Sequence, residues 1–314
     1  MIQKDLAFIF PGQGSQTEGM LTDVLHEPVV AATLQEANDA LGYDLRSIIL
    51  EGSKEELGKT VNTQPAILTV SIALWRLWCE KSSVRPEYLA GHSLGEYSAL
   101  VAAGVISFAD AVKLVSQRAN YMQDAVQPGE GAMAAILGMD DADVVALCSE
   151  AANGEVLSAV NFNSPGQVVI AGTASAVERA AVLAKEKGAR KVMPLPVSVP
   201  SHCLLMKPAA DRLAVDMGAL VFAAPQIAVI HNVDVKTHTD STEIKTSLIE
   251  QLYQPVRWTE TVESMVASGV THLVECGPGK VLSGLTKRID KTVTSLNIDG
   301  EVTLNEALTY FENR

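Results

Sequence analysis

The chain has 314 residues, of which 47% are hydrophobic and 19% charged, so it can form one large domain or a large domain with a smaller one. Its net charge of −13 argues against a nucleic acid as a partner, because proteins that bind nucleic acids carry basic surfaces. The four cysteines are scattered without a C-x-x-C pair, which is typical of reduced core thiols in a cytoplasmic protein.

The most apolar stretches are too short or too interrupted to enter a membrane. The first, residues 6–10, has five apolar residues before Pro11, fewer than a signal peptide requires. The longest, residues 65–79, contains two hydroxyl residues and Arg76, so it cannot span a bilayer. We therefore expect a buried helix there and no contact with a membrane.

Leu6–Phe10 is fully apolar, which is the pattern of a buried parallel strand, and a glycine-rich turn follows at residues 11–16. Such a turn can bind a dinucleotide, but the fingerprint G-x-G-x-x-G requires a third glycine where this chain has Thr17. Nucleotide binding is therefore disfavoured. The alternative is that the backbone N–H of Gln13 faces a developing negative charge, as one donor of an oxyanion hole.

A second strand ends in a turn that contains a serine. The apolar run Tyr88–Ala90 leads into G-H-S-L-G at residues 91–95, and a helical segment starts near Glu96. This is G-x-S-x-G in its required setting of strand, sharp turn and helix. The turn exposes the hydroxyl of Ser93 and points the N–H of Leu94 at the same place, where the helix N-terminus adds partial positive charge. The alternative is a chance pentapeptide in an ordinary turn.

Residues 107–126 have helical periodicity, and one charged side chain lies on or beside the apolar face. Arg118 stands four residues after Leu114 and four before Met122. A buried guanidinium requires an anionic partner, because an unpaired buried charge is very costly. That partner is either an internal carboxylate or one carried by a substrate, and the sequence does not distinguish them.

Between residues 127 and 196 the pattern changes to short strands and helices. Six segments alternate as strand, helix, strand, strand, helix, strand, at residues 131–137, 140–152, 156–161, 167–171, 175–187 and 190–193. This order is that of a ferredoxin-like unit. Because turn-rich segments bound it, we predict an inserted ferredoxin-like subdomain at residues 129–197.

The remaining segments predict an α/β class protein, whose α/β-hydrolase-like large domain (residues 1–128 and 198–314) has a parallel sheet and a nucleophile elbow. Strands are expected at residues 227–231 and 272–275, with helices at 241–252, 259–268 and 302–314. G-P-G-K follows the last strand, but Val274 and Val281 occupy the positions where a P-loop needs glycine and Ser or Thr. We therefore exclude a P-loop.

A serine hydroxyl is a poor nucleophile until a neighbouring base takes its proton. Among the six histidines, His202 is favoured because its proline-flanked loop lies where the inserted unit returns to the main sheet. His231, at the end of an apolar strand, is the second candidate, whereas His92 is expected to be structural. Cys203 is a weak alternative nucleophile. The spacing H-E-x-x-H is absent from the sequence, so we expect no metal.

Together these motifs resemble the malonyl-CoA:acyl carrier protein transacylases of fatty acid synthesis, over residues 8–285. The matching stretches are FPGQGSQ (10–16), TQPA (63–66), GHSLGEY (91–97), the Arg118 helix, NFNSPGQVVIAG (161–172), PVSVPSH (196–202) and GPGKVL (277–282). Jointly they are specific, whereas G-x-S-x-G alone does not separate a transferase from an esterase.

The resemblance implies a role for each of eight residues. They are Ser93 as nucleophile, His202 as base, Arg118 as clamp on the malonyl carboxylate, the N–H groups of Gln13 and Leu94 as oxyanion hole, the carbonyl of Gln251 as support of the His202 ring, and Gln64 and Asn161 as lining of the pocket.

The implied reaction is a ping-pong acyl transfer from malonyl-CoA to the phosphopantetheine thiol of acyl carrier protein. No cofactor is expected, since the phosphopantetheine belongs to the partner, and the chain is expected to act as a cytoplasmic monomer. Two rivals remain. A thioesterase would pass the acyl group to water, and a binding module without catalysis would hold the carrier protein only.

Overall fold

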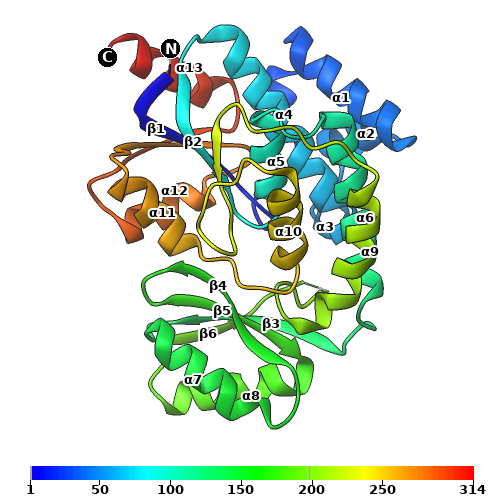
Figure 1. The fold of residues 1–314 in the computed structure, drawn as a ribbon, viewed down its shortest axis with the longest axis vertical. Helices are drawn as coiled ribbons and strands as arrows, with labels where there is room; N and C mark the ends of the chain where they lie inside the picture. The colour runs from blue at the N-terminus through cyan, green and yellow to red at the C-terminus, as the bar shows by residue number, and fades with distance from the viewer. Residues whose placement is uncertain (1, 198) are drawn as a thin grey trace.

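A computed structural model describes residues 2–197 and 199–314, which form a large lobe and a small lobe (Figure 1). The large lobe is built on a five-stranded sheet in the order β7-β2-β1-β8-β9, in which all neighbouring strands are parallel. These strands are β1 Ile2–Phe10, β2 Arg85–Gly91, β7 Ala228–Ile230, β8 His272–Cys276 and β9 Thr294–Ile298. The predicted α/β class is confirmed.

Both faces of this sheet are buried, which is why its strands are apolar without alternation. In β1, Leu6, Phe8 and Phe10 join one hydrophobic cluster, whereas Ala7 and Ile9 join another on the opposite face. The first cluster includes residues of α1 Pro28–Leu41, α2 Leu45–Glu51, α3 Lys54–Gly58, α4 Thr60–Lys81, α5 Gly95–Ala102, α6 Phe108–Asp124, α9 Lys207–Gly218, α10 Ser241–Gln251 and α13 Glu301–Glu312. The second includes residues of α11 Trp258–Ala267 and α12 Val281–Ile289.

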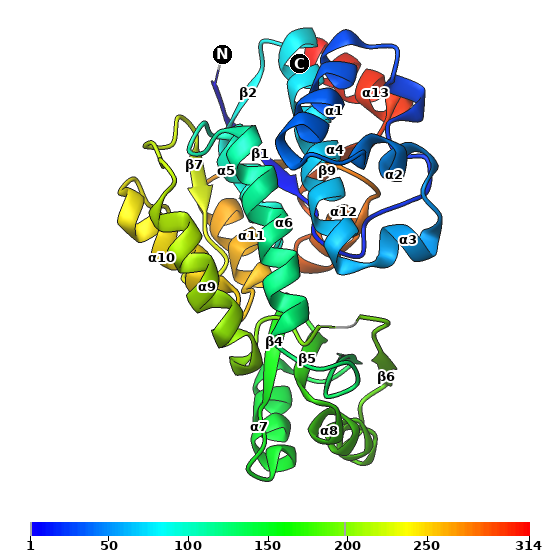
Figure 2. The ribbon, with the colours of Figure 1, turned by 90° about the vertical axis from the view of Figure 1, so that its right-hand side faces the viewer.

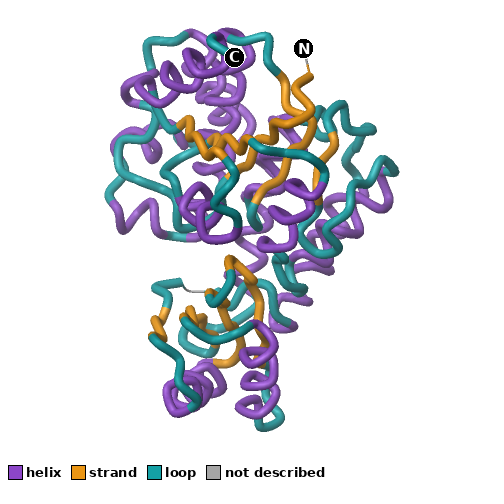
Figure 3. Tube along the Cα trace, turned by 90° about the vertical axis from the view of Figure 1, so that its left-hand side faces the viewer, coloured by secondary structure: helices purple, strands orange, loops and turns teal. Residues whose placement is uncertain are grey.

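The small lobe is a four-stranded antiparallel sheet in the order β4-β5-β3-β6. Its elements are β3 Gly131–Leu137, α7 Asp141–Ala152, β4 Leu157–Ser164, β5 Gln167–Thr173, α8 Ala174–Glu186 and β6 Lys191–Pro194, in the predicted ferredoxin-like succession. Figures 2 and 3 show α7 and α8 on the side away from the large lobe, with the small sheet separate from the large one. The bounds 129–197 stay a prediction, and residue 198, where the second part of the large domain is expected to begin, lies outside the described residues.

The faces of the small sheet have different partners. Residues such as Ile136 and Ile170 pack with α7 and α8, whereas Met133 and Val160 form a second cluster on the other face together with Cys203. Cys203 precedes the short 3₁₀ helix η2 Leu204–Met206, just after His202. The small sheet therefore contributes one apolar face to the surroundings of the predicted base.

Several elements differ from the sequence-based expectation. Helix α4 begins at Thr60, five residues before the expected start at Pro65. The short 3₁₀ helix η1 Thr22–Val24 and the elements α2, α9, α12 and β9 are not anticipated. Strand β9 is missed because TSLNI lies at the sheet edge, where four of its five residues are only half-buried and the sequence lacks an apolar run. No helix of the described residues is long and apolar enough to cross a bilayer.

Candidate active site

The turn around Ser93 is tightly packed and strained. Ser93 has φ of +52°, in the left-handed region that non-glycine residues rarely adopt. The flanking glycines permit this turn, because a Cβ on Gly91 would lie 1.9 Å from the carbonyl carbon of Gly95. A Cβ on Gly95 would lie 2.0 Å from the carbonyl oxygen of Phe10. Strand β1, strand β2 and helix α5 therefore meet at backbone contact distance, as a nucleophile elbow requires.

This packing predicts that Gly95→Ala lowers the free energy of unfolding by about 1–3 kcal/mol or more, because the added methyl group must displace backbone. The control is Gly284→Ala in α12, where a Cβ meets no atom within 4 Å. There we expect a gain of about 0.5–1 kcal/mol from helix propensity. Denaturant unfolding of both variants measures the difference. Equal midpoints for Gly95→Ala and the unchanged protein would contradict the close packing.

His202 lies beside the serine, and a backbone carbonyl on the far side of its ring fixes the ring's orientation. The Ser93 hydroxyl donates to its Nε2 at 2.8 Å, and its Nδ1–H donates to the carbonyl oxygen of Gln251 at 2.6 Å. That second bond fixes the tautomer in which Nε2 is free to accept a proton. Burial, together with the positive charge of Arg118, lowers the pKa of His202 to about 3. The other candidate, His231, contacts Glu96 and not the serine.

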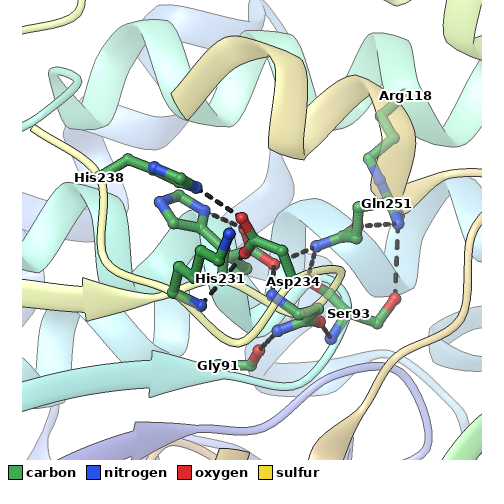
Figure 4. A network of polar contacts seen from close by, with 10 residues as sticks. Gly91, Ser93, Arg118, His231, Asp234, His238 and Gln251 are labelled. Atoms are coloured by element: carbon green, nitrogen blue, oxygen red, sulfur yellow. Dashed lines mark hydrogen bonds and ion pairs between the residues drawn. The ribbon is translucent and has the colours of Figure 1, made fainter. Parts of the chain in front are cut away.

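Arg118 of α6 is 1% exposed and points at the serine (Figure 4). Its Nη1 donates to Oε1 of Gln64 at 2.7 Å, and its Nη2 donates to Oε1 of Gln251 at 3.1 Å and to the Ser93 hydroxyl at 3.4 Å. Its Nε has no hydrogen-bond partner among the described residues, and none of their carboxylates lies within 4.0 Å of the guanidinium. The buried charge is therefore hydrogen-bonded to neutral groups only.

The two predicted oxyanion donors come from adjoining turns. The turn after β1 packs on the elbow, since the N–H of His92 donates to the carbonyl of Phe10 at 3.0 Å and a Cβ on Gly12 would lie 2.4 Å from the carbonyl of His92. Within the described part of the chain, no hydrogen bond uses the backbone N–H of Gln13 or of Leu94. Both donors are available to a ligand.

One cavity of about 110 Å³ brings the site together. Every predicted site residue lines it except Gln251, which acts from behind His202 and Arg118. Asn161 of β4 and Met133 of β3 belong to its wall, so the small sheet closes one side of the cavity. A half-buried serine paired with a buried histidine, free N–H donors and an unneutralised guanidinium thus surround a space for a small acyl group.

Comparison with known proteins agrees with this geometry. A family model described as "Acyl transferase domain" matches residues 7–304. The chain belongs to the acyl transferase family. It is 57% identical to the malonyl CoA-acyl carrier protein transacylase of Salmonella typhimurium, over 96% of this chain and 98% of that protein.

Solved structures of this family have the same fold. An acyl carrier protein S-malonyltransferase from Vibrio cholerae superposes with a TM-score of 0.95 at 56% identity, covering 96% of this chain and 99% of the other. A malonyl-transacylase solved in complex with its type II PKS acyl-carrier protein superposes with a TM-score of 0.96 at 53% identity, covering 99% of this chain and 100% of the other. The suspected family resemblance is therefore confirmed.

The other reactive side chains near this acyltransferase's site are accounted for. His92 contacts Oδ1 of Asn163 through Nε2 at 2.8 Å, and burial lowers its pKa. The thiol of Cys203 donates to the carbonyl of Pro200 at 3.2 Å, and burial raises its pKa to about 11. A thiol with so high a pKa carries little of the reactive thiolate, so it does not compete with Ser93 as nucleophile.

Sequence reasoning missed three polar groups behind the serine: Asn232, the carboxylate of Glu96 and the side-chain amide of Gln251. Glu96 could have been suspected, because it is the one charged residue in the otherwise apolar or small segment that becomes α5. Nothing in the sequence pairs it with residues more than 130 positions away.

Proposed function

We propose that this acyltransferase transfers the malonyl group of malonyl-CoA to the phosphopantetheine thiol of acyl carrier protein, through a malonyl ester on Ser93, and so supplies fatty acid synthesis. The names and high identity of its relatives support this assignment. The observation that carries it is Arg118, a buried cation that touches the nucleophile and has no carboxylate partner among the described residues. A carboxylate on the acyl group would complete that site.

In the first half-reaction, Ser93 Oγ attacks the thioester carbonyl while His202 Nε2 takes the hydroxyl proton. The N–H groups of Gln13 and Leu94 donate to the oxyanion of the tetrahedral intermediate. When the C–S bond breaks, His202 returns the proton to the departing thiolate of CoA. The products are malonyl-Ser93 and free CoA.

In the second half-reaction, the phosphopantetheine thiol of the carrier gives its proton to His202 and attacks the serine ester. Collapse of the intermediate breaks the C–O bond, and Ser93 recovers its proton. A thiol with a pKa of about 8.5 is a much better leaving group than an amine. The carbonyl of Gln251 is therefore a sufficient hydrogen-bond acceptor for the Nδ1–H of His202. Serine enzymes that cleave amides use a carboxylate at this position.

Arg118 gives selectivity for the acyl group. Its two terminal nitrogens are 2.7–3.4 Å from neutral acceptors that a malonyl carboxylate can supplement or replace. An acetyl group leaves the guanidinium without an anion, and buried polar sites reject such analogues strongly. Gln64 and Asn161 line the same cavity and complete the pocket.

The test is the intact mass of the protein after brief mixing with malonyl-CoA, followed by peptide mapping and then by addition of phosphopantetheine-bearing carrier protein. We expect a malonyl adduct on Ser93 that persists in buffer and disappears when the carrier is added. An adduct lost in buffer alone would indicate a thioesterase. The absence of any adduct would favour a module that binds the carrier protein without catalysis. Ser93→Ala is the matched control, because it cannot form the ester.

The proposal also covers the cellular compartment and the oligomeric state of the enzyme. We assign the reaction to the cytoplasm, which agrees with the unpaired cysteines Cys79, Cys148, Cys203 and Cys276. The monomeric state stays a prediction. A measurement of molar mass in solution, such as light scattering, can check it.

A further inference from the structure

A buried carboxylate that the reaction does not use lies behind the nucleophile. Glu96, in the first turn of α5, is fully buried, and three donors converge on it. Its Oε1 accepts from Nδ1 of His231 at 2.7 Å, and its Oε2 accepts from the backbone N–H of Asn232 at 3.1 Å and from Nε2 of Gln251 at 2.8 Å. A buried charge is retained only where such donors satisfy it.

Two of these neighbours hold the backbone of the serine. Oδ1 of Asn232 accepts from the N–H of Ser93 at 2.7 Å, and its Nδ2 donates to the carbonyl of Gly91 at 2.7 Å. Nε2 of Gln251 donates to the carbonyl of Ser93 at 2.9 Å. Both polar backbone groups of a residue in the strained left-handed region are therefore bound by side chains from the other half of the chain (Figure 4).

The same contacts decide which way the Gln251 amide points. Its NH₂ group faces two acceptors, Glu96 Oε2 and the carbonyl of Ser93, so its oxygen faces Nη2 of Arg118. A carboxylate only accepts hydrogen bonds and a guanidinium only donates them. In the reverse orientation, the amide oxygen would face the acceptors Glu96 and the Ser93 carbonyl, and the NH₂ group would face the donor Arg118. Glu96 thus fixes the acceptor that Arg118 uses.

We propose that Glu96, Asn232 and the side chain of Gln251 form a positioning unit, the elbow clamp, which holds Ser93 in its reactive geometry and orients Arg118 toward the acyl carboxylate. This inference rests on the proposed malonyl transfer. The three residues act through Ser93, His202 and Arg118, and only the backbone of Gln251 contacts the base. Arrangement matters because a misplacement of about 1 Å in an active site costs on the order of a hundredfold in rate.

The experiment measures formation of malonyl-Ser93 and acetyl-Ser93 by rapid quench and intact mass, over a range of acyl-CoA concentrations. The variants are Asn232→Ala, Asn232→Asp, which keeps the acceptor for Ser93, and Gln251→Met, which keeps the backbone carbonyl. The control is Leu34→Ala in α1, a buried core residue that belongs neither to the cavity wall nor to the elbow clamp. Rates are expressed per folded molecule, from unfolding curves recorded in parallel.

For Asn232→Ala we expect the saturating acylation rate to fall about a hundredfold while KM changes by less than about threefold, because Arg118 stays in place. Asn232→Asp should recover part of that rate. Gln251→Met should lose rate and also at least about tenfold of the malonyl-over-acetyl preference, because Arg118 loses its fixed acceptor. Leu34→Ala should lower the melting temperature and leave both quantities unchanged.

Two results would overturn the elbow clamp. One is acylation by Asn232→Ala at the parent rate per folded molecule, and the other is an unchanged malonyl preference in Gln251→Met. If the unchanged protein itself forms no malonyl-Ser93, the proposed function fails first, and that result is distinct from either. If Asn232→Ala does not fold, Gln251→Met decides the question by its malonyl-over-acetyl preference.

Discussion

Replacing Arg118 with methionine is expected to lower kcat/KM for malonyl transfer by about 10²–10⁴, while acetyl transfer stays level or rises. Removing one partner of a buried charge pair costs about 3–5 kcal/mol, and each 1.36 kcal/mol is a factor of ten in rate. Methionine fills similar space without a charge, so acetyl-CoA no longer leaves a buried cation unpaired. The measurement is kcat/KM with both acyl donors and a common carrier protein.

Two further variants separate recognition of the carboxylate from general damage. Arg118→Lys keeps the charge but not the two-pronged geometry, so we expect an intermediate malonyl preference. Arg76→Met removes an arginine of α4 that pairs with Glu36 at 2.6 Å, and it should leave the preference unchanged. Equal losses with malonyl and acetyl donors in Arg118→Met would show a purely structural role for the guanidinium.

The fold was predictable where local pattern and tertiary environment agree. The short strands and helices of the small lobe follow alternating or 3.6-residue apolar patterns, and the β3 range Gly131–Leu137 matches its prediction to the residue. Helix α9 was missed although Ala209, Leu213 and Met217 recur at four-residue intervals and are all buried. In contrast, β9 forms a strand because it pairs with β8, and the sequence of this half-polar pentapeptide does not predict that pairing.

The site was predictable to the extent that its chemistry is local. The elbow around Ser93 is a contiguous motif, and the burial of Arg118 follows from its spacing on α6. Loop position and family resemblance favour His202 over His231 as the base, whereas family resemblance alone indicates the role of Gln251. The contacts of Asn232 and Glu96 join segments 135 or more residues apart. Only the folded chain brings those groups together, so no local pattern could reveal them.

Replacing His202 with alanine is expected to lower the rate of Ser93 acylation by on the order of 10⁴, because the hydroxyl loses the base that lies 2.8 Å away. His272→Ala is the control, since that histidine binds Tyr310 in the large lobe's outer layer and should keep the parent rate. Single-turnover acylation, followed by mass, measures both. A rate near that of the parent in His202→Ala would mean that another group takes the proton.

The pH profile tests the same residue without removing it. His202 works as a base only when neutral, and its pKa of about 3 in place of 6.5 keeps it neutral in mild acid. We therefore expect acylation to stay level from about pH 8 to about pH 5 and to fall only below that. Because a depressed histidine pKa also costs folding stability as pH drops below 6.5, the assay uses brief exposure to acid.

The charge of Arg118 is the second cause of that low pKa, after burial, and this makes the two predictions interdependent. In Arg118→Met the repulsion between guanidinium and imidazolium is gone, so the acidic inflection of acetyl transfer should move to higher pH while remaining below 6.5. An inflection near pH 6.5 in both proteins would contradict the buried, charge-coupled base. Such a result would mean that the charge of Arg118 does not influence the base that activates Ser93. The geometry predicts that it does, because the Ser93 hydroxyl contacts both Nε2 of His202 and Nη2 of Arg118.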